Sequence, residues 1–264
     1  MSEPQQQIVP HIIIPCAGEG KRFKEQGYTE PKPLIPVGGR LMLDWVLDVV
    51  PKDWMRQVIP VVKGDHSILY DTFVSTEEFR QSRFDVAEPC LLVGPTQGAA
   101  CSVLAAAVGL PPDEPVIVLN SDQYIKCNLQ AIHDKAMAEG WDAFILTFPG
   151  TGPAWSYVVT DGTDLVVQVV EKKQVSDKAT CGLYWFRRAS DLIYAISSMI
   201  YKDDRVNNEF YLAPAVNHLP LHRRNVRAVP VKVFHGLGTP EQVKLFEQHI
   251  VTRTQPELAG VGAR

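Results

Sequence analysis

The sequence has 264 residues, of which 45% are hydrophobic and 21% are charged, and its formal net charge is −4 at pH 7. This length allows one large α/β domain or two small ones with a substantial core. The negative balance argues against a nucleic-acid binder, which is usually basic. No apolar run approaches the roughly 20 residues that cross a bilayer, so membrane insertion is not expected.

The five cysteines are scattered along the chain, and no pair has the spacing of metal ligands. The first ten residues are polar and lack the basic start and apolar middle of a signal peptide. We therefore expect a cytoplasmic protein with reduced thiols rather than a disulfide framework.

Short apolar segments alternate with helical patterns in the first 150 residues. Strands are predicted at 11–15, 57–62, 89–93, 115–125 and 142–148. Helices are predicted at 41–50, 96–110 and 129–140, and mixed helix and loops at 65–88. This alternation is typical of a parallel sheet that is covered on both faces.

The pattern changes beyond residue 150. Three strands are predicted at 156–160, 164–173 and 180–186, with a tight hairpin at 161–164. Two helices at 190–200 and 208–219, a strand at 226–234 and a final helix at 239–250 capped by Thr239 follow. The whole pattern predicts an α/β fold with a Rossmann-like, open mixed, mainly parallel sheet and helices on both faces.

A glycine-rich, cationic loop follows the first strand. Gly18 and Gly20 let the backbone approach a ligand and turn amide groups toward phosphate oxygens. Arg22 can hold two oxygens at once, and the prolines beside Lys32 stiffen the backbone that aims its ammonium group. The loop therefore favours a nucleoside triphosphate site. A plain tight turn with a solvated lysine is the alternative.

Polar residues also follow two later strands, and ligands of open parallel sheets bind beyond such strand ends. Gly98 leaves room for the flat face of a base, and Gln97 offers a donor and an acceptor to an imide edge. Asp122 can hold Mg²⁺ between phosphates. Ordinary helix-start and N-cap chemistry are the alternatives for these residues.

Other polar groups lie in the second half of the chain. Glu171 suits the hydroxyls of a sugar and Lys172 a phosphate, unless both belong to a solvated strand end. Glu209 is either a substrate-side group or an acidic residue in the first turn of a helix. His235 can face the site, although a structural role is favoured. Cys16 has no histidine placed to activate it, so it is not interpreted as a nucleophile.

Taken in order, these segments resemble the sugar-1-phosphate nucleotidyltransferases, the NDP-sugar pyrophosphorylases with a GT-A-like fold. The matching stretches are PCAGEGKRF, PKPLIPVGGR, TQGAA, LNSDQ, EKK, TCGLYWF and NEFYLAP. The resemblance covers roughly residues 9–250. We expect a single domain at 1–252, with a nucleotide-binding half at about 9–150, a sugar-phosphate half at about 151–250 and a flexible tail at 253–264.

The resemblance implies transfer of a nucleotide from an NTP to a sugar 1-phosphate, with Mg²⁺ as cofactor and Asp122 as its ligand. The implied catalytic residues are Arg22, Lys32, Asp122 and Lys172. The nucleotide-binding residues are Ala17, Gly18, Gly20, Arg22, Gln97, Gly98 and Ser121. The residues that bind the sugar phosphate are Glu171, Lys172, Gly182 and Glu209.

The chain also departs from this family. Gly236 stands where relatives often carry a second metal-binding Asp, so either His235 or a water completes the metal shell or the metal is held more loosely. Ala213 and Pro214 replace a usual Thr-Asp pair. A cytidylyltransferase acting on a phosphorylated alcohol that is not a sugar, a GT-A glycosyltransferase and a non-catalytic nucleotide-binding module are therefore alternatives.

The sequence does not determine the sugar, the pathway or the oligomeric state, and a homo-oligomer stays open. Gln97 favours UTP, dTTP or GTP over CTP and ATP. The resemblance points to building blocks of surface polysaccharide as the destination of the product. No nucleic-acid partner is expected.

Overall fold

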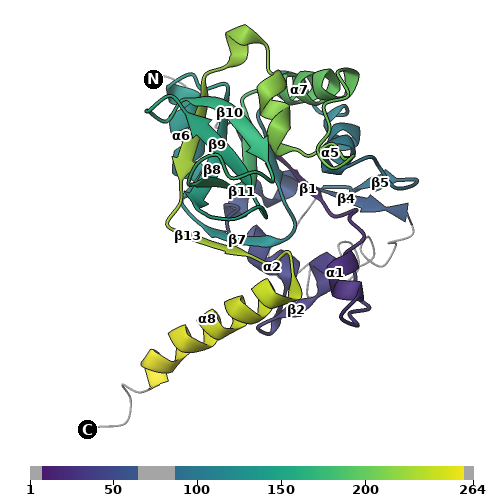
Figure 1. Cartoon of the computed structure of the whole chain (residues 1–264), viewed down its shortest axis with the longest axis vertical. Coiled ribbons are helices and arrows are strands. Elements are labelled where there is room, and N and C mark those ends of the chain that lie inside the picture. Colours follow the sequence, from purple (N-terminus) through teal and green to yellow (C-terminus); the bar gives the residue numbers. More distant parts are fainter. Residues whose placement is uncertain (1–7, 65–86, 259–264) are drawn as a thin grey trace, which may run out of the picture.

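A nine-stranded mixed sheet lies at the centre of the computed structural model, which describes residues 8–64 and 87–258 (Figure 1). Its strands in these residues are β1 (His11–Pro15), β4 (Val58–Lys63), β5 (Cys90–Leu92), β6 (Val116–Leu119), β8 (Ala143–Pro149), β9 (Ser156–Thr160), β10 (Val166–Glu171), β11 (Lys178–Phe186) and β12 (Val226–Pro230). Their order is β10-β9-β11-β6-β1-β4-β5, and β8 pairs with β11 and β12. The strands around β1 are parallel, whereas β11 is antiparallel to β6 and β8.

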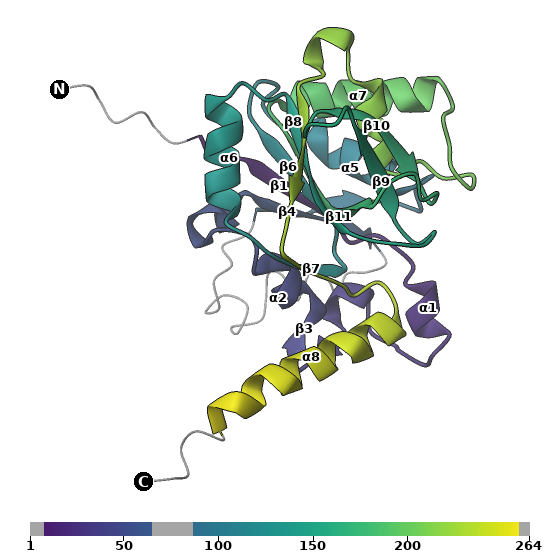
Figure 2. The same ribbon diagram turned by 60° about the vertical axis from the view of Figure 1, so that its left-hand side comes forward.

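Helices cover both faces of this sheet (Figure 2). Those that form the two main cores are α2 (Met42–Leu47), α5 (Ala99–Ala107), α6 (Leu129–Ala138) and α7 (Ala189–Tyr201). Side chains of α2 and α6 share one hydrophobic core, and side chains of α5 and α7 share the other. The predicted mixed α/β sheet with helices on both faces is confirmed.

Strand β1 shows why its sequence is apolar without alternation. Ile12 and Ile14 point into the core under α2 and α6, whereas Ile13 points into the core under α5 and α7. All three side chains are fully buried. A strand that is covered on both faces has no polar side to show, so a continuous apolar run is required.

The pairing of β1 with β6 brings two loops to one edge of the sheet. The strands are parallel, with Ile12 opposite Ile117 and Ile13 opposite Val118. Their carboxyl ends therefore lie side by side. The Ser121 hydroxyl donates a 3.0 Å hydrogen bond to the carbonyl of Pro15, which ties the two ends together.

A smaller layer lies below the sheet in Figures 1 and 2. Its elements are α1 (Lys21–Lys24), β2 (Pro36–Val37), β3 (Arg40–Leu41), β7 (Gln123–Lys126), β13 (Val233–Gly236) and α8 (Pro240–Leu258). Short 3-10 helices connect the larger elements, and they are η1 (Lys32–Leu34), η2 (Lys52–Gln57), η4 (Ala213–His218) and η5 (Leu221–Arg223).

The final helix supports the cationic loop. Phe246 of α8 is buried in a third hydrophobic cluster together with Phe23 of α1. The Gln26 amide donates a 2.7 Å hydrogen bond to Glu241 at the start of α8. The Thr239 hydroxyl accepts from the Gln242 amide at 3.3 Å, as expected of the predicted cap. Helix α8, near the end of the chain, thus helps to hold α1 and the cationic loop in position.

Two predicted strands are divided in the structure, and one predicted helix is only partly helical. The strand predicted at 115–125 is β6 followed by β7, with the polar residues between them. The strand predicted at 226–234 is β12 followed by β13, and Pro230, which has no amide hydrogen to donate, ends β12. The helix predicted at 208–219 is wrong over its first half, because only Ala213–His218 is helical.

The first half of that segment is a hairpin instead. Val206 and Glu209 exchange two backbone hydrogen bonds of 3.0 Å. Asn207 and Asn208 between them have φ values of 48° and 64°. Two consecutive residues at positive φ are typical of a tight turn, for which asparagine is favoured over most side chains.

The end of the final helix and the segment at 65–88 also differ from the prediction or lie outside the described residues. The final helix ends at Leu258, beyond its predicted end at residue 250, and the assignment of 253–264 to a flexible tail stays a prediction. Most of the predicted helix and loops at 65–88 lies outside the described residues. No helix in the described part has the length and hydropathy of a bilayer-spanning segment.

Strand β11 bends at Gly182, which has a φ of 73°. Its pairing with β8 shifts register between Thr180 and Tyr184. The Gly182 carbonyl accepts hydrogen bonds from the Asn120 amide at 2.9 Å and from the Gln123 side chain at 3.0 Å. A Cβ on residue 182 would lie 2.5 Å from the Asn120 side-chain nitrogen. Glycine at this bend therefore positions the polar end of β6.

We expect Gly182→Ala to lower the free energy of unfolding by at least about 3 kcal/mol, because strain at positive φ and a steric clash add up. Gly162→Ala is the matched control, since Gly162 also has a positive φ of 97° but no atom within 4 Å of its added Cβ. The control should lose about 1–2 kcal/mol. Urea unfolding measures both, and equal losses would contradict this explanation.

Candidate active site

The glycine-rich loop lines a cavity of about 440 Å³ at the carboxyl ends of β1 and β6. The predicted nucleotide-binding residues that line it are Ala17, Gly18, Gly20, Gly98 and Ser121. Lys32 and Asp122 line it as well. The structure therefore brings together residues from three separate stretches of the sequence.

Lys32 and Asp122 meet in this cavity. The Lys32 ammonium donates a 2.5 Å hydrogen bond to the Asp122 carboxylate, and the two side chains are 19% and 32% exposed. Lys32 comes from η1, and Asp122 comes from the connection between β6 and β7. A cation and an anion are thus both accessible to a ligand in one place.

A second cavity of about 350 Å³ adjoins the first. The residues that line both are Ala99, Asn120, Asp122 and Tyr211. Glu171, Lys172 and Gly182, which were predicted to bind the sugar phosphate, line the second cavity. Arg22, which is exposed on α1, also lines this cavity rather than the first. Asp122 therefore stands at the junction of two adjacent hollows, each of which is lined in part by charged side chains.

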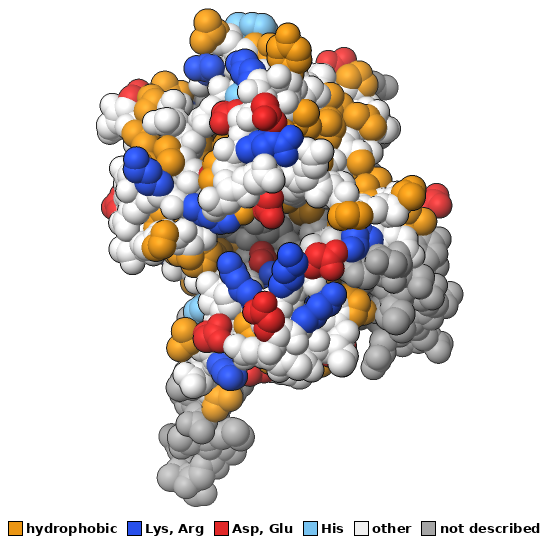
Figure 3. Space-filling view, turned by 45° about the vertical axis from the view of Figure 1, so that its right-hand side comes forward, with side chains coloured by type: hydrophobic (Ala, Val, Ile, Leu, Met, Phe, Trp, Pro, Cys, Tyr) orange, Lys and Arg blue, Asp and Glu red, His pale blue; other side chains and the backbone are white. Residues whose placement is uncertain are grey.

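Basic side chains gather near this junction. Figure 3 shows a hollow across the middle of the molecule, with several Lys and Arg side chains along its lower side and acidic ones among them. The exposed basic residues of α1 are Lys21, Arg22 and Lys24. The Glu19 carboxylate is held by Lys63 and lies 3.6 Å from Lys24. The Lys63 contact lowers the pKa of Glu19.

Glu171 ends β10 inside the second cavity. The Ser156 hydroxyl donates a hydrogen bond to its carboxylate. Burial raises the pKa of Glu171, and the Ser156 hydrogen bond and the charge of Lys172 oppose that rise. A partly buried carboxylate with free acceptor capacity can bind the hydroxyl groups of a ligand.

Lys172 follows Glu171 in an uncommon backbone conformation. Its φ is 55°, which is unusual for a residue with a side chain. Its amide donates a 3.0 Å hydrogen bond to the carbonyl of Trp155. The ammonium group donates to the Tyr211 hydroxyl and lies 4.1 Å from the centre of that ring. Strain of this kind, about 1–3 kcal/mol, is commonly found where a side chain is held for function.

Gly98 has a structural reason for lacking a side chain. Its φ is 135°, and a Cβ there would lie 2.6 Å from the Phe210 backbone nitrogen. The crossing of residues 209–211 over the start of α5 therefore requires glycine, whether or not a base binds there. Gln97 is exposed outside the first cavity, in a shallow hollow that adjoins it at Thr96 and Glu209.

Glu209 differs from its prediction. It lines the nucleotide-side cavity and the shallow hollow, not the cavity that holds Glu171. The first-turn alternative fails as well, because Glu209 closes the hairpin and is not helical. The tight turn at Asn207 and Asn208 precedes Glu209, which lines both hollows together with Thr96.

Gly236, which stands where relatives often carry a second metal-binding Asp, has no room for a side chain. A Cβ on Gly236 would lie 2.8 Å from the Trp155 ring and 2.9 Å from the Gln242 amide nitrogen. His235, the other candidate for a metal shell, packs against Phe246 and His249 with ring centres 5.0 and 4.5 Å apart. It does not line the second cavity, so the structural interpretation of His235 holds.

Asp122 is the carboxylate best placed to hold a metal ion. In the described ranges no group of three or more His, Cys, Asp and Glu residues converges as a metal site. Mg²⁺ is usually bound by one or two carboxylates together with waters and substrate phosphates. A single carboxylate therefore fits an ion that arrives with a polyphosphate, and it does not fit an all-protein cage.

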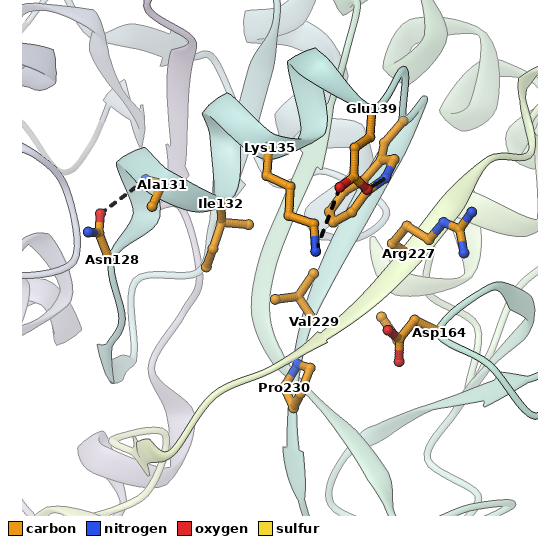
Figure 4. Close-up of a pocket in the computed structure, with 11 residues that line it drawn as sticks. Asn128, Ala131, Ile132, Lys135, Glu139, Asp164, Arg227, Val229 and Pro230 are labelled. Carbon is orange, nitrogen blue, oxygen red and sulfur yellow. Dashed lines mark hydrogen bonds and ion pairs between the residues drawn. The ribbon is translucent and has the colours of Figure 1, made fainter.

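A separate hollow of about 520 Å³ lies between α6 and β12 (Figure 4). None of the predicted site residues lines it. Its charged side chains include Lys135 and Glu139, which lie 3.9 Å apart along α6. It is lined chiefly by apolar groups such as Ile132 and Val229. We do not assign catalysis to this hollow.

Sequence reasoning missed several residues of the second cavity. These are Asn120, Trp155, Ser156, Tyr211 and Gln242. Tyr211 and Asn120 stand inside stretches that carry the family resemblance, so they could have been found there. Trp155, Ser156 and Gln242 reach the cavity through strand pairing and the docking of α8, for which the sequence gives no local signal.

Comparison with known proteins agrees with this architecture. The model of the nucleotidyl transferase family matches residues 11–212, so the chain belongs to that family. The bifunctional protein GlmU of Clostridium kluyveri is 25% identical over 253 residues, which are 92% of this chain and 52% of that protein. The chain spans about half the length of the curated relatives that it matches. The predicted family resemblance is confirmed.

Solved structures share the fold. A nucleoside-diphosphate-sugar pyrophosphorylase from Vibrio cholerae RC9 aligns with a TM-score of 0.75 and 22% identity, covering 90% of this chain and 99% of that one. A UDP-glucose pyrophosphorylase from Acinetobacter baumanii aligns with a TM-score of 0.73 and 16% identity, covering 92% and 93%. At these identities the similarity establishes the fold of sugar nucleotidyltransferases.

The sequence assigns Glu171 to the sugar phosphate. On that assignment we expect Glu171→Gln to raise the KM for a sugar 1-phosphate about ten- to hundredfold, because a charged acceptor is lost. The KM for the nucleotide should stay unchanged. Steady-state kinetics measure both constants, and Glu139→Gln, at the residue that follows α6, is the matched control. A wild-type KM for the sugar 1-phosphate in Glu171→Gln would contradict the assignment.

The same variant should be at least as stable as the wild type at pH 7. The folded pKa of Glu171 is raised, so wild-type stability falls as the pH rises from the unfolded value of about 4.5 through the folded value. Glutamine removes that dependence. Thermal unfolding between pH 4 and pH 8 checks the sign.

Proposed function

We propose that this chain transfers a nucleotidyl group from an NTP to a sugar 1-phosphate and releases pyrophosphate. The observation that carries the proposal is the meeting at Asp122 of two cavities, each of which is lined by both basic and acidic side chains. The first adjoins the glycine-rich loop and suits a triphosphate. The second offers a carboxylate and a lysine, which suit a phosphorylated sugar.

In the proposed reaction, an oxygen of the sugar phosphate attacks the α-phosphorus of the NTP in line. A bond forms between that oxygen and the phosphorus, and the bond to the bridging oxygen of the β-phosphate breaks, so pyrophosphate leaves. The attacking oxygen is already an anion. No general base is required, and catalysis consists mainly of positioning and charge stabilisation.

Charge is the main obstacle to this reaction. Two like unit charges about 4 Å apart repel each other by about 4 kcal/mol at an effective dielectric constant near 20. Lys32 on the nucleotide side, and Arg22 and Lys172 on the sugar side, would offset that repulsion. Asp122 would hold Mg²⁺ together with the phosphates, and the ion would withdraw charge from the reacting group.

The residues of the second cavity favour a neutral, hydroxyl-rich group beyond the phosphate. Glu171 and Gln242 supply acceptors and an amide donor, and the Trp155 ring supplies an apolar wall. The specific base and sugar follow from neither cavity. We propose UTP, dTTP or GTP as donors because Gln97 can pair with an imide edge.

A grid of NTPs against sugar 1-phosphates, read by pyrophosphate release, tests the proposal. We expect release with at least one sugar 1-phosphate and one of UTP, dTTP and GTP in the presence of Mg²⁺. Release only with CTP and a phosphorylated alcohol would indicate a cytidylyltransferase. Consumption of NDP-sugars without pyrophosphate would indicate a glycosyltransferase, and no turnover would indicate a binding module.

We expect Lys32→Ala and Asp122→Ala each to lower kcat by at least about two orders of magnitude, because each removes a charge that faces the phosphates. Circular dichroism should show an unchanged fold. Lys135→Ala, in the hollow between α6 and β12, is the control and should keep the wild-type rate. Near-wild-type kcat in both site variants at saturating Mg²⁺ would refute these roles.

A further inference from the structure

Tyr211 forms part of the wall between the two cavities of the site. It is among the residues that line both. Its hydroxyl accepts a hydrogen bond from the Lys172 ammonium group, which also lies 4.1 Å from the centre of its ring. One side chain therefore holds the head group of Lys172 through an oxygen atom and through an aromatic face.

The backbone beside Tyr211 is joined to the nucleotide side. The Phe210 amide donates a 2.9 Å hydrogen bond to the Gln97 carbonyl, and the Ala100 amide donates a 3.1 Å bond to the Phe210 carbonyl. Gly98 packs directly under this crossing. Residues 97–100 and 209–211 are thus fastened to each other, so a displacement of one segment displaces the other.

Glu209 adds a side-chain connection. Glu209 lines the first cavity together with Tyr211. Burial raises the pKa of the Tyr211 hydroxyl, the negative charge of Glu209 contributes to that rise, and Lys172 opposes it. The hydroxyl oxygen accepts the hydrogen bond from Lys172, and a tyrosine hydroxyl has a proton of its own to donate to a further acceptor.

We propose that Tyr211 is a positioning residue that couples the two substrate sites by holding Lys172 and linking it to the nucleotide-side segment. The inference rests on the proposed function and assigns Tyr211 no contact with the reacting atoms. Nucleotide binding sets the position of residues 97–100, which sets Tyr211 and, through it, Lys172. Because coupling between sites is reciprocal, each substrate tightens the other by the same factor.

A double-mutant cycle tests the action through Lys172. The variants are Tyr211→Phe, which keeps the ring and removes the hydroxyl, Lys172→Met, and the two combined. We expect Tyr211→Phe to lower kcat/KM about tenfold or more in the wild-type background, because a hydrogen bond to a charged group is lost. It should have no further effect in the Lys172→Met background. Tyr194→Phe, at an exposed position of α7, is the control and should change nothing.

A binding experiment tests the coupling itself. The dissociation constant of glucose 1-phosphate is measured by calorimetry with and without saturating non-hydrolysable UTP and Mg²⁺. We expect at least about fivefold tighter binding with the nucleotide in the wild type, and loss of that difference in Tyr211→Phe. Multiplicative effects in the cycle, an unchanged coupling factor in the variant, or no coupling in the wild type would each overturn the inference.

The two proposals fail in different ways. If no NTP and sugar 1-phosphate release pyrophosphate with the wild type, the proposed function fails, and the binding experiment still decides whether Tyr211 couples two ligand sites. If the wild type turns over normally and Tyr211→Phe has the same effect with and without Lys172, only the coupling inference fails.

Discussion

The ion pair between Lys32 and Asp122 is the contact on which the rest of the site depends. It joins residues that are 90 positions apart in the sequence. The parallel pairing of β1 with β6 and the bond from Ser121 to Pro15 bring them together. In the free protein the two charges neutralise each other. When the substrates bind, Lys32 would contact the triphosphate and Asp122 would contact the divalent cation. A reaction between two polyanions needs positive charge at this point.

Several residues around the Lys32–Asp122 ion pair have positive φ values or are very closely packed. Lys172 lies at positive φ, Gly182 bends β11, and Gly98 admits the crossing of Phe210. The region near Gly236 is closely packed by Trp155 and Gln242. The packing around Gly236 leaves Asp122 as the carboxylate at the junction of the two cavities. The shape of the second cavity depends on contacts between residues that are distant in the sequence.

Periodicity predicted the sheet and its two-sided covering, and strand-end polarity marked the region of Asp122 as a ligand site. Those features follow from local patterns, because an apolar run such as Ile12 to Ile14 reports burial directly. The hairpin at Asn207 and Asn208 was missed, since an apolar stretch after it imitates a helix. Trp155 and Gln242 could not be predicted, because docking of distant elements brings them to the cavity. The roles assigned to individual site residues stay predictions.

A crystal structure with a non-hydrolysable UTP analogue, Mg²⁺ and a sugar 1-phosphate tests the central claim most directly. The account predicts the triphosphate beside Gly18 and Gly20, with the Lys32 ammonium moved from Asp122 to a phosphate oxygen and Asp122 bound to the ion. A nucleotide bound elsewhere, such as in the hollow between α6 and β12, with the Lys32–Asp122 pair intact, would contradict it.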